Sequence, residues 1–171
     1  MTLKSTLART TAKSAHWLLH DVLHRGGTSL PGKLAVSIDP DVLKSIQQDF
    51  DLVIVTGTNG KTLTTALITR VLQAGGYEVI TNHSGSNMIQ GITGTLVTSK
   101  IKPSANGKKP VAVLEVDEAN VEKIASAIKP KMFVLTNIFR DQLDRYGEIY
   151  TTYDKIIAGI KHAPEAVVLA N

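Results

Sequence analysis

Cysteine is absent from the 171 residues, and no uninterrupted apolar run reaches the length of a membrane span. The first absence excludes disulfides and thiolate metal sites within these residues, which fits a reducing compartment. The second excludes a membrane-spanning helix. Lys, Arg and His interrupt the amino-terminal residues, so these lack the continuous apolar segment of a secretory signal. With 43% hydrophobic residues the chain can bury a core, and we expect a cytoplasmic globular protein.

Acidic residues are scarce at the amino terminus. Residues 1–33 hold five basic residues and one acidic residue, whereas the rest of the chain has 14 of each, so the net charge of +4 belongs to this segment. Apolar residues recur at helical spacing over residues 3–24. A basic helix of this kind either packs on its own protein, which we favour, or lies at the anionic inner surface of the membrane. We interpret His16, His20 and His24, four residues apart, as a solvated face and not as a metal site.

The stretch from Asp51 to Thr65, D-L-V-I-V-T-G-T-N-G-K-T-L-T-T, has the most specific pattern in the chain. Its apolar run from Leu52 to Val55 predicts a strand buried on both faces. A loop with two glycines follows, and then apolar residues recur as on the buried face of a helix. These are Leu63, Ala66, Leu67 and Val71. Strand, glycine loop, Lys-Thr and helix in this order are typical of a phosphate-binding P-loop.

The residue types of this loop suit an anion. Glycine lets the backbone point successive N–H groups inward, and the positive end of the next helix adds to their attraction. We predict that the nucleotide phosphates lie on Gly57, Thr58, Asn59, Gly60, Lys61 and Thr62. The lysine would reach the β- and γ-phosphates and the threonine hydroxyl would bind Mg²⁺. The general motif has a glycine where this chain has Val55, so a turn that binds nothing remains the alternative.

Four further apolar stretches predict strands. They cover residues 77–81, 111–116, 132–136 and 166–170. Helical spacing appears between them, over residues 88–96, 119–128 and 151–162, with Gly91 and Gly94 as unexpected helix residues. Strands that alternate with helices predict an α/β fold, a doubly wound and mostly parallel sheet with right-handed crossovers.

The amino-terminal part has a different organisation. We expect residues 1–40 to form the basic helical segment and a connector around Pro31, and residues 41–171 to form the P-loop domain. A short helix is expected from 39 to 48, and residues 99–110, rich in lysine and turn formers, are expected to form a solvated loop.

Polar side chains follow two of the predicted strands. Glu115 lies at the end of an apolar strand, where a carboxylate is costly to bury without a partner. Mg²⁺ beside the P-loop would be such a partner, and a satisfied structural acid is the alternative. Asp117 and Glu118 are expected to start the next helix, because acidic residues favour the positive end of its dipole. After residues 132–136 comes a polar cluster that suits either a ligand site or a charged helix start. It contains Asn137, Arg140, Asp141, Gln142, Asp144 and Arg145.

Three motifs together resemble the Mur ligase family. They are T-G-T-N-G-K-T, L-E-V-D-E and T-N-I-F-R-D-Q-L-D-R-Y-G-E, in this order within residues 56–148. The resemblance implies an ATP- and Mg²⁺-dependent ligase in which Lys61 and Glu115 are catalytic and Glu115 binds the metal with Thr62. It also implies that Asn87, in G-S-N-M, faces substrate. Gln142 stands where many members have a metal-side histidine, and a neutral glutamine binds metal only weakly through its oxygen.

The short amino-terminal segment is similar to family members that act with a glutaminase. The resemblance implies ATP-dependent activation of the D-glutamate α-carboxylate in the lipid II stem peptide as an acyl phosphate. Ammonia from a GatD-like glutamine amidotransferase partner, in a heterodimer, would convert it to D-isoglutamine during peptidoglycan synthesis. Such members continue past the final L-A-N into a zinc ribbon and a ligase domain, so the central domain here is expected to be incomplete, to lack zinc and to be inactive alone.

Three other functions remain open. One is an amino-acid-adding ligase of the Mur or folylpolyglutamate type. Another is a non-catalytic nucleotide-binding interaction module. The third is a general P-loop kinase or GTPase, of which the GTPase is least favoured because no N/T-K-x-D guanine motif is apparent. Nothing in the sequence points to nucleic acid as a partner.

Overall fold

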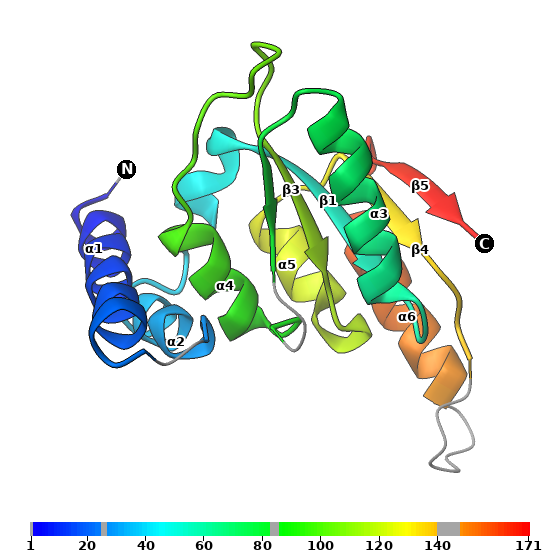
Figure 1. The fold of residues 1–171 in the computed structure, drawn as a ribbon. Coiled ribbons are helices and arrows are strands. Elements are labelled where there is room, and N and C mark those ends of the chain that lie inside the picture. Colours follow the sequence, from blue (N-terminus) through cyan, green and yellow to red (C-terminus); the bar gives the residue numbers. More distant parts are fainter. Residues whose placement is uncertain (1, 25–26, 83–85, 140–147) are drawn as a thin grey trace.

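The computed structural model describes residues 2–24, 27–82, 86–139 and 148–171. Within these ranges five strands form one sheet in the order β2-β3-β1-β4-β5, and every neighbouring pair is parallel (Figure 1). The strands are β1 (Asp51–Thr56), β2 (Val79–Thr81), β3 (Val111–Glu115), β4 (Met132–Leu135) and β5 (Val167–Ala170). The predicted parallel α/β sheet is confirmed. None of the helices in these ranges combines the length and apolar character that a membrane span requires.

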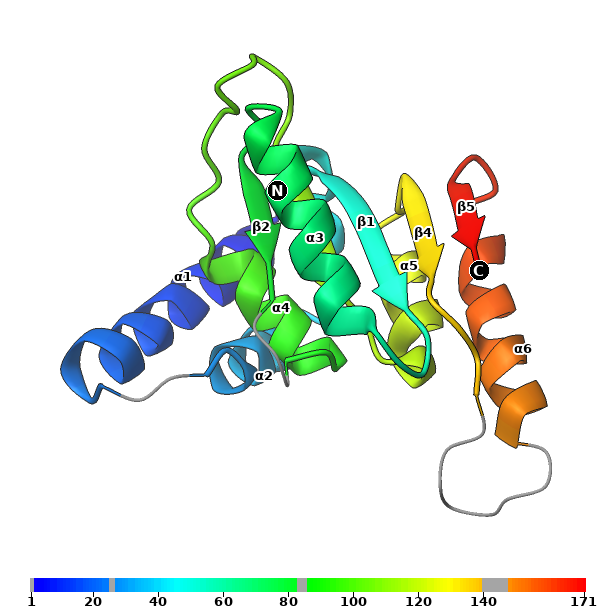
Figure 2. The ribbon, with the colours of Figure 1, turned by 45° about the vertical axis from the view of Figure 1, so that its right-hand side comes forward.

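Helices cover both faces of the sheet. One face, with Val53 and Val55, packs against α3 (Lys61–Ala74) through Ile68 and Leu72. The other face packs against α4 (Ile89–Thr98), α5 (Val121–Ala127) and α6 (Glu148–Lys161) (Figures 1 and 2). Successive residues of β1 therefore serve opposite cores, which explains why its sequence is apolar throughout.

The amino-terminal helices share the larger of these cores. Helix α1 (Leu3–Trp17) continues into a π-helical turn, η1 (Leu18–Val22), and is followed by α2 (Ser29–Ile38). Ala8, Ala12 and Ala35 lie in the same buried cluster as the inner side chains of β1. The prediction that the residues around Pro31 form a connector is wrong. Proline is tolerated there because it lies in the first turn of α2, where its missing N–H has no intrahelical acceptor.

The helices α2 and α4 cross in backbone contact. A Cβ atom at Gly32 would lie 1.8 Å from the carbonyl oxygen of Gln90, and one at Gly94 would lie 1.8 Å from the carbonyl oxygen of Thr28. Any side chain would push the helices apart at this point. Gly94, one of the two glycines that the sequence leaves unexplained inside α4, therefore permits this crossing.

Replacing Gly94 with alanine is expected to lower the free energy of unfolding by about 3 kcal/mol, because overpacking a rigid contact of two backbones forces them apart. Chemical denaturation measures the loss. The matched control is Gly75→Ala at the end of α3, where the nearest atom to the new Cβ is 3.3 Å away. Equal stability losses for the two variants would show that the α2–α4 crossing tolerates a methyl group.

The face that α3 turns to the sheet differs from the prediction. Leu63, Leu67 and Val71 were expected inside but are 66%, 55% and 72% exposed, and Ala66 is also exposed. The buried positions of α3 are Thr65 and Thr69. The loop before α3 explains this rotation. The side chain of Thr62 is directed at β3, and Thr65 and Thr69, three and seven residues later, lie on the same side of the helix.

Other boundaries shift by a few residues. The short helix expected over 39–48 is a turn followed by a 3-10 helix, η2 (Lys44–Asp49). The helix expected over 119–128 begins as a 3-10 turn, η3 (Glu118–Asn120), before α5. Residues 99–110 contain neither helix nor strand, as expected for a loop.

Candidate nucleotide and metal site

The glycine loop joins β1 to α3 at the carboxyl edge of the sheet. Gly57 and Gly60 have φ angles of +125° and +81°. At Gly57 a Cβ atom would also lie 2.4 Å from Thr136 Oγ1 and 2.6 Å from the Asn137 carbonyl oxygen, so both conformation and space require glycine. The first hydrogen bond of α3 runs from the Thr64 N–H to the Gly60 carbonyl at 2.9 Å. The N–H groups from Gly60 to Leu63 therefore have no helical acceptor, which is the arrangement that binds anions.

The segment after β4 braces this loop. The Thr58 N–H donates to the Asn137 carbonyl, and the Asn59 N–H donates to Asn137 Oδ1, each at 2.9 Å. Thr136 Oγ1 donates to the Asn59 carbonyl at 2.7 Å. The main-chain amides of Thr58 and Asn59, predicted to face phosphate, thus already have protein acceptors. An anion bound to this loop would therefore meet the N–H groups of its second half, from Gly60 onward, which have no helical acceptor.

The hydroxyl of Thr62 donates to Glu115 Oε2 at 2.7 Å. The parallel register pairs Val55 with Glu115, which places the carboxylate beside the start of the glycine loop. Asn82 fixes the Glu115 backbone from the other side, since its Oδ1 accepts from the Glu115 N–H at 2.9 Å and its Nδ2 donates to the Glu115 carbonyl at 2.8 Å. The sequence predicts that Thr62 and Glu115 converge, and the structure brings them together.

These two side chains suit Mg²⁺. Glu115 is 7% exposed, and within the described ranges no basic side chain pairs with it, although a buried carboxylate needs a cation. Hydroxyl and carboxylate oxygens are ligands of the type that Mg²⁺ prefers, and this ion completes its shell with water and phosphate. No group of three His, Cys, Asp or Glu able to hold a metal occurs among the described residues, the amino-terminal histidines included.

Lys61 and Glu118 form an ion pair within the same loop region. Their Nζ and Oε1 atoms are 2.9 Å apart, and the two side chains are 14% and 18% exposed. The sequence assigns Glu118 only to the start of a helix. Asp117 does cap that helix, accepting from the Ala119 N–H at 3.0 Å, but Glu118 turns to the glycine loop instead. The sequence signal that could have indicated this role is that Glu118 is a second carboxylate, three residues after Glu115.

The remaining predicted site residues divide into two groups. Asn87 is among the residues that the structure describes. Its backbone carbonyl accepts a hydrogen bond from the Asp117 N–H at 3.0 Å, so Asn87 lies beside the end of β3, close to the carboxylates. Gln142 lies outside the described residues, as do Arg140, Asp141, Asp144 and Arg145. Their assignment remains a prediction.

Two open cavities adjoin the loop on opposite sides. One, of about 490 Å³, lies toward β4 and β5 and is lined by Gly60, Thr64, Asn137 and Asn171 among others. The other, of about 290 Å³, lies between α3 and β2, with Thr62, Thr65, Asn82 and Glu115 in its wall. The glycine loop thus has one open cavity on its β4–β5 side and another, with Thr62 and Glu115 in its wall, on its α3–β2 side.

Comparison with known proteins agrees with this geometry. A family profile for the Mur ligase middle domain matches residues 55–170. The chain is 50% identical, over all 171 residues, to the lipid II isoglutaminyl synthase (glutamine-hydrolyzing) subunit MurT of Streptococcus pneumoniae, and covers 37% of that protein. It is 42% identical over 124 residues, 72% of the chain, to the protein of the same name from Staphylococcus aureus (strain N315), and covers 27% of it.

Solved structures show the same fold at lower identity. MurF ligase from Thermotoga maritima in complex with ADP superposes with a TM-score of 0.63 and 20% identity, over 78% of this chain and 31% of that one. MurF from Acinetobacter baumannii gives a TM-score of 0.63 and 18% identity, over 80% and 29%. The chain therefore spans about a third of the length of the proteins that it resembles.

Proposed function

The chain belongs to the Mur ligase family, and from this premise we propose that it is the nucleotide-binding part of an ATP-dependent ligase that amidates lipid II. The observation that carries the proposal is the hydrogen bond between Thr62 and the buried Glu115 at the mouth of a glycine loop. A hydroxyl and a buried carboxylate that pairs with no basic side chain among the described residues suit the Mg²⁺ ion of a bound nucleotide.

The names of the relatives support the identity of the substrate. Proteins 50% and 42% identical to this chain are named as the MurT subunit of a glutamine-hydrolysing lipid II isoglutaminyl synthase. We infer that the acceptor is the D-glutamate α-carboxylate of the lipid II stem peptide and that the product is D-isoglutamine. A glutamine amidotransferase subunit of the GatD type would release the ammonia and complete a heterodimer.

The described residues suit the first chemical step. An acceptor carboxylate oxygen attacks the γ-phosphorus of ATP, the bond to the β,γ-bridging oxygen breaks, and ADP leaves with that electron pair. Lys61 and the amides of the α3 amino terminus would hold the phosphates in line, and Thr62 and Glu115 would hold Mg²⁺, which neutralises developing charge. Ammonia then attacks the acyl carbon, phosphate leaves, and the nitrogen loses a proton.

The test is isotopic. A ligase subunit that contains these 171 residues is incubated with its glutaminase, lipid II, ATP, Mg²⁺ and glutamine labelled with ¹⁵N in the side-chain amide. We expect one ¹⁵N atom per stem peptide, in the α-amide of D-isoglutamine, by mass spectrometry. An amino-acid-adding ligase would instead add the mass of a whole residue. Nucleotide binding with neither product would identify a non-catalytic interaction module.

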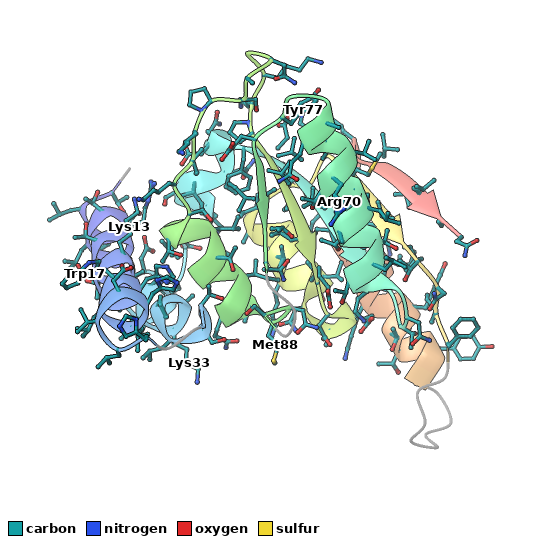
Figure 3. The ribbon with its side chains drawn as sticks, in the orientation of Figure 1. Lys13, Trp17, Lys33, Arg70, Tyr77 and Met88 are labelled. Carbon is teal, nitrogen blue, oxygen red and sulfur yellow. The ribbon has the colours of Figure 1, made fainter. Side chains whose placement is uncertain are left out.

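We also propose that the exposed side of α1 rests on the membrane that carries a lipid-linked acceptor. The opposite side of this helix packs on the protein through Ser5, Ala8 and Ala12. Large apolar side chains of α1, and of the η1 turn that continues it, are each nearly half exposed or more: Leu3, Leu7, Trp17, Leu18 and Val22. Lys13, Trp17 and Lys33 all lie at the α1–α2 end of the molecule (Figure 3), and the first 33 residues carry the net charge. Apolar side chains beside lysines match an anionic lipid surface.

Trp17 is the only tryptophan, so its fluorescence reports this contact directly. With vesicles containing anionic phosphatidylglycerol at low salt, its emission is expected to shift to the blue as the indole leaves water. Leu7→Gln combined with Leu18→Gln should weaken binding about tenfold or more, since each removes apolar area from the contact. The control Leu63→Gln changes an equally exposed leucine on α3 and should bind normally. An unshifted spectrum and no retention on the vesicles would exclude membrane contact.

A further inference from the structure

The ammonium group of Lys61 has three hydrogen-bond acceptors. Its Nζ contacts the carbonyl oxygen of Gly57, the carbonyl oxygen of Thr58 at 3.3 Å, and Glu118 Oε1 at 2.9 Å. A lysine ammonium has three N–H donors, so all of them have partners here. A phosphate oxygen can bind this lysine only if one of these acceptors is released.

Glu118 is the acceptor most easily replaced. The two carbonyls belong to the loop itself, whose backbone is braced through Thr58 and Asn137. Glu118 reaches the lysine from a different segment, η3, by a side chain that can rotate away. It also carries the negative charge that a phosphate would bring. Two anions this close repel each other strongly in a poorly screened site, so carboxylate and phosphate compete for one ammonium.

We propose that Glu118 is a positioning residue of the nucleotide site, acting through Lys61. It holds the lysine over the loop when the phosphates are absent, yields it to the incoming phosphates, and recovers it as the product nucleotide leaves. The inference rests on the proposed function in one respect, that Lys61 binds phosphate. As a consequence of this competition for Lys61, the chain binds nucleotide more weakly, and releases ADP faster, than it would without the Glu118 carboxylate.

The local fold does not depend on the Glu118 carboxylate. Asp117 caps η3, its backbone N–H donates to the Asn87 carbonyl, and Asn120 Nδ2 donates to its Oδ1 at 3.3 Å. Glutamine at position 118 has nearly the same shape and keeps an oxygen that can accept from Lys61. The variant Glu118→Gln therefore changes the charge at this position and leaves the geometry in place.

The experiment compares nucleotide binding by the chain and by its Glu118→Gln variant. Calorimetry gives the Kd for ATP and ADP with and without Mg²⁺, and stopped-flow displacement of a fluorescent ADP gives the release rate. We expect Kd to fall about tenfold and ADP release to slow by a similar factor, with the larger change when Mg²⁺ is absent, because the unscreened phosphates then depend most on Lys61. If Glu118 served only the structure, the Glu118→Gln variant would bind nucleotide more weakly instead.

The matched control is Glu122→Gln. It removes the same charge one helical turn further on, from an exposed carboxylate whose partner, at 3.8 Å, is His162 and not Lys61. We expect unchanged Kd and release rate for this variant. Unchanged or weaker binding by Glu118→Gln, with normal binding by the unsubstituted chain, would overturn the role of Glu118 alone. Failure of the unsubstituted chain to bind nucleotide at all would overturn both this inference and the proposed function.

Discussion

Replacing Lys61 with alanine should weaken the binding of ATP and ADP by about 100-fold or more. The lysine is the one side-chain cation that the described structure places in the glycine loop, and it is 14% exposed, so water screens its charge poorly. Truncating one partner of a buried, hydrogen-bonded charge pair costs roughly 2–5 kcal/mol, which is about a 30- to several-thousand-fold change in Kd. Calorimetry on the folded chain measures it.

Two further variants separate lost binding from lost folding. Lys61→Ala leaves the Glu118 carboxylate half-buried without its partner, so the double variant Lys61→Ala, Glu118→Gln should recover stability but not nucleotide affinity. Lys44→Ala removes an exposed lysine that pairs with Asp41 outside the site, and should bind normally. Nucleotide affinity within a few-fold of normal in the Lys61→Ala chain would exclude this loop as the phosphate site.

Replacing Glu115 with glutamine should remove the dependence of nucleotide binding on Mg²⁺ and lower turnover of the complete ligase by about 10²- to 10³-fold. Glutamine keeps an oxygen that can accept from Thr62, so the arrangement at the end of β3 is preserved. It lacks the negative charge that holds a divalent cation. The measurement is the ratio of ATP Kd values with and without Mg²⁺, which should approach one in the variant.

The same substitution gives a second, independent result. In the absence of Mg²⁺ the Glu115→Gln chain should unfold at a temperature equal to or above that of the unsubstituted chain, because a buried carboxylate without a cation is replaced by a neutral group. An acid that served only the structure would show the opposite, a loss of stability with undisturbed Mg²⁺ dependence. That pair of results would reject Glu115 as a metal ligand.

Sequence patterns predict the centre of the sheet well because β1 and β3 are buried on both faces. A run such as Leu52 to Val55 has no other stable environment, and the alternation of strands and helices then determines the topology. Sequence patterns give wrong predictions where a contact between residues far apart in the sequence determines the local structure. Apolar spacing places Leu67 inside, but the direction of Thr62 toward Glu115 rotates α3 and exposes it. Pro31 and its neighbours read as a connector, yet they form a helix because α4 presents glycine to them.

The candidate site, like the fold, could be predicted from the sequence only in part. Glu115 stands out because a charge in an apolar strand needs a partner. The glycine loop stands out by the order of strand, loop, Lys-Thr and helix, although Val55 replaces the first glycine of the general motif. Glu118 could not be separated from an ordinary helix-start acid, since only the fold brings it within 2.9 Å of Lys61. Nor does the sequence show that Asn137, in the segment after β4 and 78 residues along the chain from Asn59, braces the loop. The role of Gln142, which lies outside the described residues, remains a prediction.

A crystal structure of the chain with Mg²⁺ and a non-hydrolysable ATP analogue tests the nucleotide and metal site most directly. We predict Mg²⁺ bonded at about 2.1 Å to the Thr62 hydroxyl, with the Glu115 carboxylate in its coordination shell and Lys61 Nζ moved from Glu118 to a phosphate oxygen. Phosphates bound away from residues 57–62, with Glu115 still accepting from Thr62 and Lys61 still on Glu118, would contradict it.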